Sequence, residues 1–173
     1  VERYIREVLP GKPNVSSDYA FQLEWWKTQI GDVLLSELTP VLISEYRDLL
    51  SKKITFRKAQ ISHATVNRYL AALSTAISTA INEWGWMEDN ILRKVSKLKE
   101  PRGRVRYFSD EERERFLLAC KESHNSDLYV AVILALSTGG RKNEIWGLSW
   151  KDVDLKNGFI TFGETKNDEP RSV

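Results

Sequence analysis

The sequence from residue 134 to residue 154, LALSTGGRKNEIWGLSWKDVD, contains a polar turn between an apolar segment and a short amphipathic one. Gly139 and Gly140 permit a tight turn there and expose the N-terminus of the helix that we expect to follow. Such an N-terminus has unpaired N–H groups and a partial positive charge. We therefore expect this turn to attract a phosphate group.

Arg141 lies in the first turn of the same expected helix, where a cation is unfavourable for helix stability. Its planar guanidinium can bind two phosphate oxygens at once, and Glu144, one turn later, is placed to hold it in one orientation. The alternative is an ordinary surface Arg–Glu pair, worth less than about 1 kcal/mol. The local sequence leaves both interpretations open. The Gly-Lys-Ser/Thr ending of a P-loop is absent, so this is not a Walker-type loop.

Helical patterns precede this turn in the second half of the chain. Ser109 and Glu112 have the spacing of a capping box, which predicts a helix that begins there and runs through Cys120. A more apolar helix is expected over residues 128–137, buried all round. Another helix is expected to begin near residues 139–140.

Alternating residues after these helices predict a small antiparallel sheet. Residues 154–158 read as a turn before a strand at 159–162, and residues 166–168 read as a turn before a second strand. Lys166 lies in that second turn, where a lysine is usually only a solvated charge. It becomes a candidate for chemistry if the hairpin reaches the same cleft as Arg141.

The first part of the chain, residues 1–95, reads as a helical bundle with no strand signal. The spacing of apolar residues predicts helices over 2–9, 16–30, 39–50 and 62–84. Caps and breakers support these bounds, because serine or threonine precedes the later helices and Pro or Gly ends the runs.

A strongly basic segment follows the bundle. It holds seven basic residues, opposed only by Glu100: Arg93, Lys94, Lys97, Lys99, Arg102, Arg104 and Arg106. We expect residues 96–107 to form an extended, positively charged linker between two domains, 1–95 and 108–173.

Basic residues of the bundle and of the linker are candidates for contacts with a duplex backbone. The candidates of the bundle, which we expect on its helices, are Lys52, Lys53, Arg57, Lys58 and Arg68. The candidates of the linker are Arg102, Arg104 and Arg106. A solvated surface is the commoner explanation for any single one of them, so the prediction depends on the group.

Composition excludes several classes of protein. The 173 residues are 42% hydrophobic and 29% charged with a formal net charge of +2, which predicts a folded protein and leaves charge to be judged locally. The single cysteine, Cys120, excludes an internal disulfide. The two histidines, His63 and His124, lie far apart, and one cysteine is too few for a Cys-rich metal module, so a zinc site is not expected. No apolar run has the roughly 18 residues of a membrane span, and we expect a cytoplasmic protein.

Residues 134–154 resemble the first arginine box of the tyrosine site-specific recombinases, the phage integrase family. The Thr-Gly-x-Arg-x-x-Glu core of that box is followed by Leu-x-Trp-x-Asp-Val-Asp, as in the family. Residues 164–167 resemble the hairpin that carries the family's catalytic lysine. Residues 64–73 resemble the long helix of its core-binding domain, and residues 101–112 its linker and the start of its catalytic domain.

The resemblance implies a mainly α fold: a helical SAM-like core-binding bundle, a basic linker, and the α+β beginning of an integrase catalytic domain. In this family a tyrosine attacks a DNA phosphate and forms a 3′-phosphotyrosyl link, so strand exchange needs no ATP, cofactor or metal. The resemblance implies that Arg141 neutralises phosphate charge, that Lys166 is the general acid for the leaving 5′-oxygen, and that Glu144 supports Arg141. The implied partners are double-stranded DNA at attachment or core sites and further copies of the protein, up to a tetrameric synapse.

The sequence departs from the family pattern in one respect. The family needs a His-x-x-Arg box, a further His or Trp, and a nucleophilic Tyr after the lysine hairpin. Neither His63 nor His124 begins such a box, and every tyrosine precedes Arg141. We therefore expect the front part of a recombinase, encoded by a bacterium or phage, that binds DNA but does not cleave it alone.

Two other classes of protein stay open on the sequence. One is a helical DNA-binding accessory or regulatory factor without catalysis. The other is a helical interaction module in which the basic linker is only a solvated tether. Salt dependence of DNA binding separates these two, because a DNA binder loses affinity steeply as salt rises.

Overall fold

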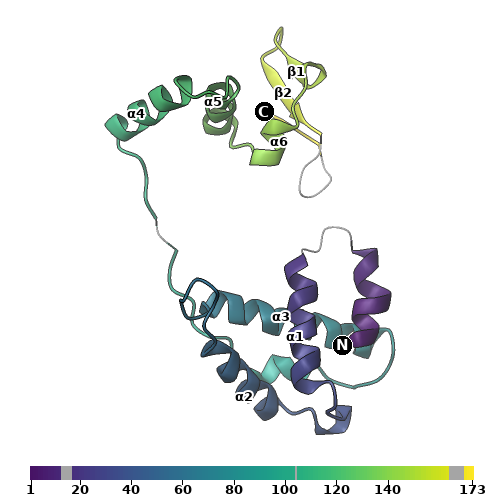
Figure 1. Ribbon diagram of the computed structural model, residues 1–173. Coiled ribbons are helices and arrows are strands. Elements are labelled where there is room, and N and C mark those ends of the chain that lie inside the picture. The colour runs from purple at the N-terminus through teal and green to yellow at the C-terminus, as the bar shows by residue number, and fades with distance from the viewer. Residues whose placement is uncertain (13–16, 104, 164–169) are drawn as a thin grey trace. The chain divides into compact units, whose positions relative to one another are not determined.

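A computed structural model describes residues 1–12, 17–103, 105–163 and 170–173 (Figure 1). The chain divides into two compact units, Val1–Gly103 and Arg104–Val173. The first unit is helical, and the second combines helices with a three-stranded antiparallel sheet, so the predicted fold class is confirmed. Within the described ranges, no helix has the length and apolarity needed to cross a membrane.

The first unit is built on three helices: α1 (Ser17–Ile30), α2 (Pro40–Ser51) and α3 (His63–Asn82). Shorter helical turns flank them: η1 (Tyr4–Val8), η2 (Leu9–Gly11), η3 (Leu35–Glu37) and η4 (Ile91–Lys94). The Thr39 hydroxyl accepts a hydrogen bond from Leu42 N, and the Ser62 hydroxyl accepts one from Thr65 N. The predicted caps of α2 and α3 are therefore confirmed.

The core of the first unit lies between α1, α2 and α3. The apolar spacing that predicts this helix places Tyr19, Leu23, Trp26 and Ile30 in one stripe. The last three are buried and Tyr19 is half-buried. The indole N–H of Trp26 also donates to the Tyr69 carbonyl at 2.7 Å, which joins α1 to α3. Trp26 and Ile30 share one buried cluster with Leu73 of α3, and Leu23 shares a second with Ala72 and Ala76 of the same helix. Burial of this apolar surface stabilises the contact between α1 and α3.

The beginning of the predicted linker is attached to α3. Asn67 accepts a hydrogen bond from Leu98 N at 2.9 Å and donates to the Leu98 carbonyl at 2.9 Å. It also donates to the Glu100 carboxylate at 2.7 Å, and His63 Nδ1 lies 2.7 Å from the Lys99 carbonyl. These contacts fix the chain as far as Glu100, and the boundary between the units follows Gly103.

The second unit contains α4 (Asp110–Lys121), α5 (Leu128–Thr138) and α6 (Lys142–Trp146), then the turn η5 (Trp150–Asp152). Its sheet has the strand order β1 (Val153–Asp154), β2 (Phe159–Phe162), β3 (Arg171–Ser172). The predicted capping box of α4 is present: Glu112 N donates to the Ser109 hydroxyl, and Ser109 N donates to the Glu112 carboxylate. In β3, Arg171 is paired with Phe162 and Ser172 with Thr161.

One expectation for this unit is wrong. Helix α5 is not buried all round, because Val130 and Leu136 are each 57% exposed and Ile133 is 37% exposed. In the described part of the unit, α5 packs mainly against α4 and α6. The apolar pattern therefore predicted the helix correctly but not its burial.

Candidate functional site

The site begins at the turn between α5 and α6, where two glycines are needed for different reasons. Gly139 ends α5 in the left-handed region at φ +62°, a backbone conformation that residues other than glycine rarely adopt. Gly140 lies so close to the sheet that an added Cβ would be 3.0 Å from the Phe162 ring and 3.0 Å from Ile145. The turn is thereby packed against β2.

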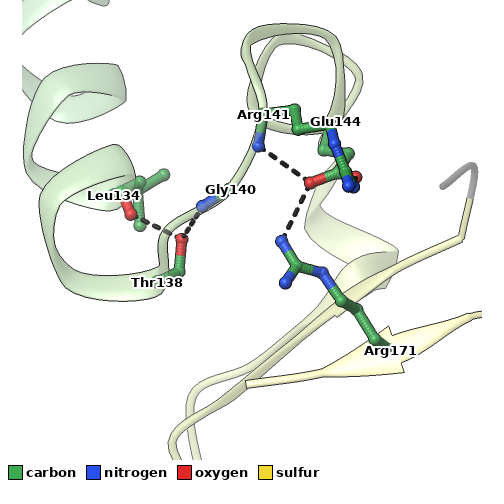
Figure 2. A network of polar contacts seen from close by, with 6 residues as sticks. All are labelled: Leu134, Thr138, Gly140, Arg141, Glu144 and Arg171. Carbon is green, nitrogen blue, oxygen red and sulfur yellow. Dashed lines mark hydrogen bonds and ion pairs between the residues drawn. The ribbon is translucent and has the colours of Figure 1, made fainter. Parts of the chain in front are cut away.

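The two N–H groups at this turn are not available to a phosphate. Thr138 Oγ1 donates to the Leu134 carbonyl at 2.6 Å and accepts from Gly140 N at 3.1 Å (Figure 2). Arg141 N donates to Glu144 Oε2 at 2.8 Å. These two N–H groups therefore already donate to the protein's own oxygens. The expectation that the N-terminus of the following helix attracts phosphate stays a prediction for the first N–H groups of α6 itself.

The charged groups of the site meet at Glu144. Its Oε1 accepts from Arg141 Nη1 at 2.6 Å. Its Oε2 accepts from Arg171 Nη2 at 2.9 Å (Figure 2). The Glu144 side chain is only 3% exposed, whereas those of Arg141 and Arg171 are 58% and 41% exposed. One buried carboxylate thus pairs with two guanidinium groups that both reach solvent. This arrangement favours the interpretation that Glu144 orients Arg141.

The protonation of Glu144 follows from these contacts. The hydrogen bond from Arg141 N lowers the pKa of the Glu144 carboxyl most, the one from the Arg141 side chain comes next, and Arg171 lowers it further, to about 2. Glu144 is therefore ionised at neutral pH. It is a poor candidate for an acid or base in a reaction and a good one for a fixed anchor.

Two predicted site residues, Lys166 and Arg104, lie outside the described residues. The expectation that Lys166 meets Arg141 at one cleft therefore stays a prediction. Among the described residues, no group of three His, Cys, Asp or Glu side chains gathers where it could hold a metal ion.

The basic residues predicted for DNA contact lie mostly between helices. Lys52 is the C-terminal cap of α2, and Lys53, Arg57 and Lys58 belong to the α2–α3 connection, so the expectation that they lie on helices is wrong for these residues. All four are exposed, as is Arg68 on α3.

The α2–α3 connection, residues 52–61, is closed by its own backbone. Ile54 and Gln60 form an antiparallel bridge, and Thr55 N donates to the Ala59 carbonyl at 2.8 Å. Lys58 adopts φ +57° to complete the turn. The connection therefore presents its cations, together with the 90% exposed ring of Phe56, on a fixed hairpin-like turn.

The two described arginines of the predicted linker differ in their contacts. Arg102 is exposed near the end of the first unit, whereas the Arg106 guanidinium pairs with the Glu112 carboxylate of α4. The Arg106 side chain nevertheless remains 76% exposed.

Sequence reasoning missed Arg171. The pattern predicts that a strand follows residue 168, but nothing local distinguishes an arginine there from a solvated one. Its contact with Glu144 depends on the pairing of β3 with β2 and on the packing of α6 against that sheet, which sequence spacing does not report.

Two family models match separate parts of the chain. The model of the "Phage integrase SAM-like domain" matches residues 18–98, and the model of the "Phage integrase family" matches residues 106–173. The chain belongs to the phage integrase family. The resemblance drawn from the arginine box and the helical first half is thus confirmed.

Individual proteins are similar to this member of the phage integrase family in sequence or in structure. It is 37% identical over 140 residues to the shufflon-specific DNA recombinase of Escherichia coli, covering 80% of this chain and 36% of that protein. A crystal structure of a lambda integrase dimer bound to a COC′ core site has a TM-score of 0.73 at 20% identity, over 99% of this chain and 57% of that one. A lambda integrase tetramer bound to a Holliday junction gives 0.70 at 21%, over 99% and 46%. The structural likeness shows the fold, and the chain spans well under two thirds of each of these proteins.

Acid should destabilise the second unit through Glu144. Because the pKa of the folded Glu144 is lowered from 4.5 to about 2, its contribution to stability is complete above the unfolded pKa and is lost as pH falls through the folded one. We expect the amide NMR signals of α6 and β2 to report loss of structure between about pH 4.5 and pH 2. The variant Glu144→Gln should be less stable at pH 6 and should show a smaller acid step, because hydrogen bonds also lower the pKa of the Asp152 and Asp154 carboxyls in the same unit.

The matched control for this prediction is Glu114→Gln, which removes an exposed carboxylate of α4 in the same unit. It should keep the acid step of the unaltered chain. An acid step that persists unchanged in Glu144→Gln would contradict the assignment to Glu144.

Proposed function

We propose that this chain is the DNA-engaging part of a tyrosine recombinase, which cleaves and rejoins DNA by phosphotyrosyl strand exchange when complete. The observation that carries the proposal is the exposed Arg141 guanidinium, held by a buried carboxylate within the family's arginine box. A guanidinium fixed in advance stabilises negative charge at low cost, because it does not have to reorganise when the charge develops.

Phosphoryl transfer sets the roles in this proposal. Charge on the nonbridging oxygens must be neutralised, the nucleophile positioned, and the leaving oxygen protonated. Arg141 meets the first need, and Glu144 limits the orientations that Arg141 can adopt. Lys166 would protonate the leaving 5′-oxygen, a role that rests on the family resemblance alone.

The first unit and the linker would hold the duplex. The α2–α3 connection carries four exposed cations on a fixed turn, and Arg68, Arg102 and Arg106 are exposed as well. Phosphate contacts of this kind position a protein on DNA without reading its sequence.

The lambda integrase structures are of DNA-bound dimers and tetramers, which supports self-association of this protein on DNA. The E. coli relative supports a cytoplasmic, bacterial or phage-encoded protein.

Salt dependence of DNA binding tests the proposed surface. Affinity of the chain for a labelled duplex should fall steeply as salt rises. The double variant Lys53→Gln, Arg57→Gln should make the log–log slope shallower by about 0.9 for each phosphate that the protein no longer neutralises. Fluorescence anisotropy between low and moderate salt measures both the affinity and the slope.

A matched control is the double variant Lys12→Gln, Lys27→Gln, which removes the same charge from exposed or half-exposed positions of the first unit outside the connection. Its slope should equal that of the unaltered chain. Equal slopes for all three proteins would contradict the assignment of DNA contact to the α2–α3 connection. Binding that is insensitive to salt would contradict the proposed function.

A further inference from the structure

Arg171 is held in place by two kinds of contact. Its Nη2 donates to Glu144 Oε2 at 2.9 Å, and its guanidinium carbon lies 5.1 Å from the centre of the Phe162 ring. Phe162 is 1% exposed and also packs against Gly140 in the turn that leads to Arg141. Arg171 therefore links the sheet directly to Glu144, which follows Arg141, and through Phe162 to Gly140, which precedes it.

The sheet does not need the Arg171 guanidinium for its register. Backbone pairing joins β2 to β3, and Ile160 and Val173 exchange hydrogen bonds of 3.0 and 2.9 Å. The hydroxyls of Thr161 and Ser172 add a contact at 2.9 Å. A purely structural role thus leaves the ion pair with Glu144 unexplained, especially because Arg171 is 41% exposed.

The two carboxylate oxygens of Glu144 accept hydrogen bonds from different donors. Oε2 accepts from Arg141 N and from Arg171, whereas Oε1 accepts from the Arg141 side chain. Fixing Oε2 fixes the plane of the carboxylate and thereby the direction in which Oε1 meets Arg141. Two guanidinium groups against one carboxylate also leave one net positive charge, whereas Glu144 alone would neutralise Arg141.

We propose that Arg171 is a positioning residue for phosphate recognition: it holds Glu144 so that Glu144 orients Arg141 without cancelling its charge. This inference rests on the proposed function, because it takes Arg141 as the group that meets the phosphate. Arg171 acts through Glu144 and not by touching the phosphate itself.

The test uses inorganic phosphate as the probe and the ¹⁵N-labelled chain. The Arg141 Nε–H signal should shift as phosphate is added, and Arg171→Gln should weaken the apparent affinity by roughly threefold to tenfold. Arg171→Lys should recover much of the loss, because lysine keeps both the donor and the charge. The control Arg113→Gln breaks an exposed pair with Asp110 in α4 and should change nothing at Arg141.

A double-mutant cycle with Glu144→Gln decides whether Arg171 acts through Glu144. When Glu144→Gln is present, Arg171→Gln should change the phosphate affinity by less than about twofold. An equal loss with and without Glu144→Gln would overturn the proposal and would indicate direct contact between Arg171 and phosphate. No loss from Arg171→Gln alone would overturn it as well.

A second readout separates this inference from the proposed function. The Glu144 carboxyl signal, followed by NMR against pH, should titrate at a higher pH in Arg171→Gln than in the unaltered chain. If phosphate does not move the Arg141 signal at all, the proposed function fails at Arg141. The Glu144 titration still decides on Arg171, because an unchanged midpoint would overturn the positioning role.

Discussion

Replacing Arg141 with alanine is expected to lower DNA cleavage about a thousandfold or more, while DNA binding changes only a few-fold. The guanidinium is exposed and paired with Glu144. Under the proposed function it would neutralise charge that develops on the nonbridging oxygens of the phosphate. Binding is spread over many phosphate contacts and depends little on one of them. The measurement is single-turnover cleavage of a nicked suicide duplex by a protein that joins this chain to the family's His-x-x-Arg and tyrosine segments.

Arg113→Gln is the matched control for this prediction. Arg113 and Asp110 form an exposed pair three residues apart on α4, the same spacing as Arg141 and Glu144. The control removes an arginine from a similar pair in the same unit, so cleavage should stay at the level of the unaltered protein. Cleavage retained in Arg141→Ala would remove Arg141 from the chemistry and leave its pair with Glu144 as a structural feature.

Features that depend on neighbours along the chain could be predicted from the sequence. The caps at Thr39, Ser62 and Ser109 form within three residues, so residue type and spacing are enough to identify them. The buried stripe of α1 follows from helical periodicity in the same way. The Arg141–Glu144 pair is also local, since it joins residues three apart. Arg141 is the N-cap of α6 and not, as expected, part of its first turn.

Features that depend on distant parts of the chain could not be predicted. The pairing of Arg171 with Glu144 joins residues 27 apart and requires the sheet register. The exposure of α5 depends on what packs around it, not on its own composition. The turn at Lys58 is local, but it has no glycine to mark its positive φ. The bridge between Ile54 and Gln60 closes it instead.

Replacing Trp26 with alanine is expected to destabilise the first unit by about 4 kcal/mol. The indole is fully buried between α1 and α3, its ring meets Trp25 edge-on at 4.8 Å, and its N–H donates to the Tyr69 carbonyl. The substitution leaves a large cavity and removes a buried hydrogen-bond donor. Urea unfolding, followed through the amide NMR signals of α3, measures the free energy of unfolding for this unit alone.

Phe21→Ala on the same helix provides the control, because Phe21 is 62% exposed and its loss should cost less than about 0.5 kcal/mol. The contrast between two aromatic residues five positions apart tests whether the buried face of α1, rather than helix formation itself, holds the bundle together. Similar losses for both variants would mean that α1 is stabilised by its own helical propensity. A small loss for Trp26→Ala would instead mean that the core around α3 closes over the cavity, so that the α1–α3 contact carries less of the stability than its burial indicates.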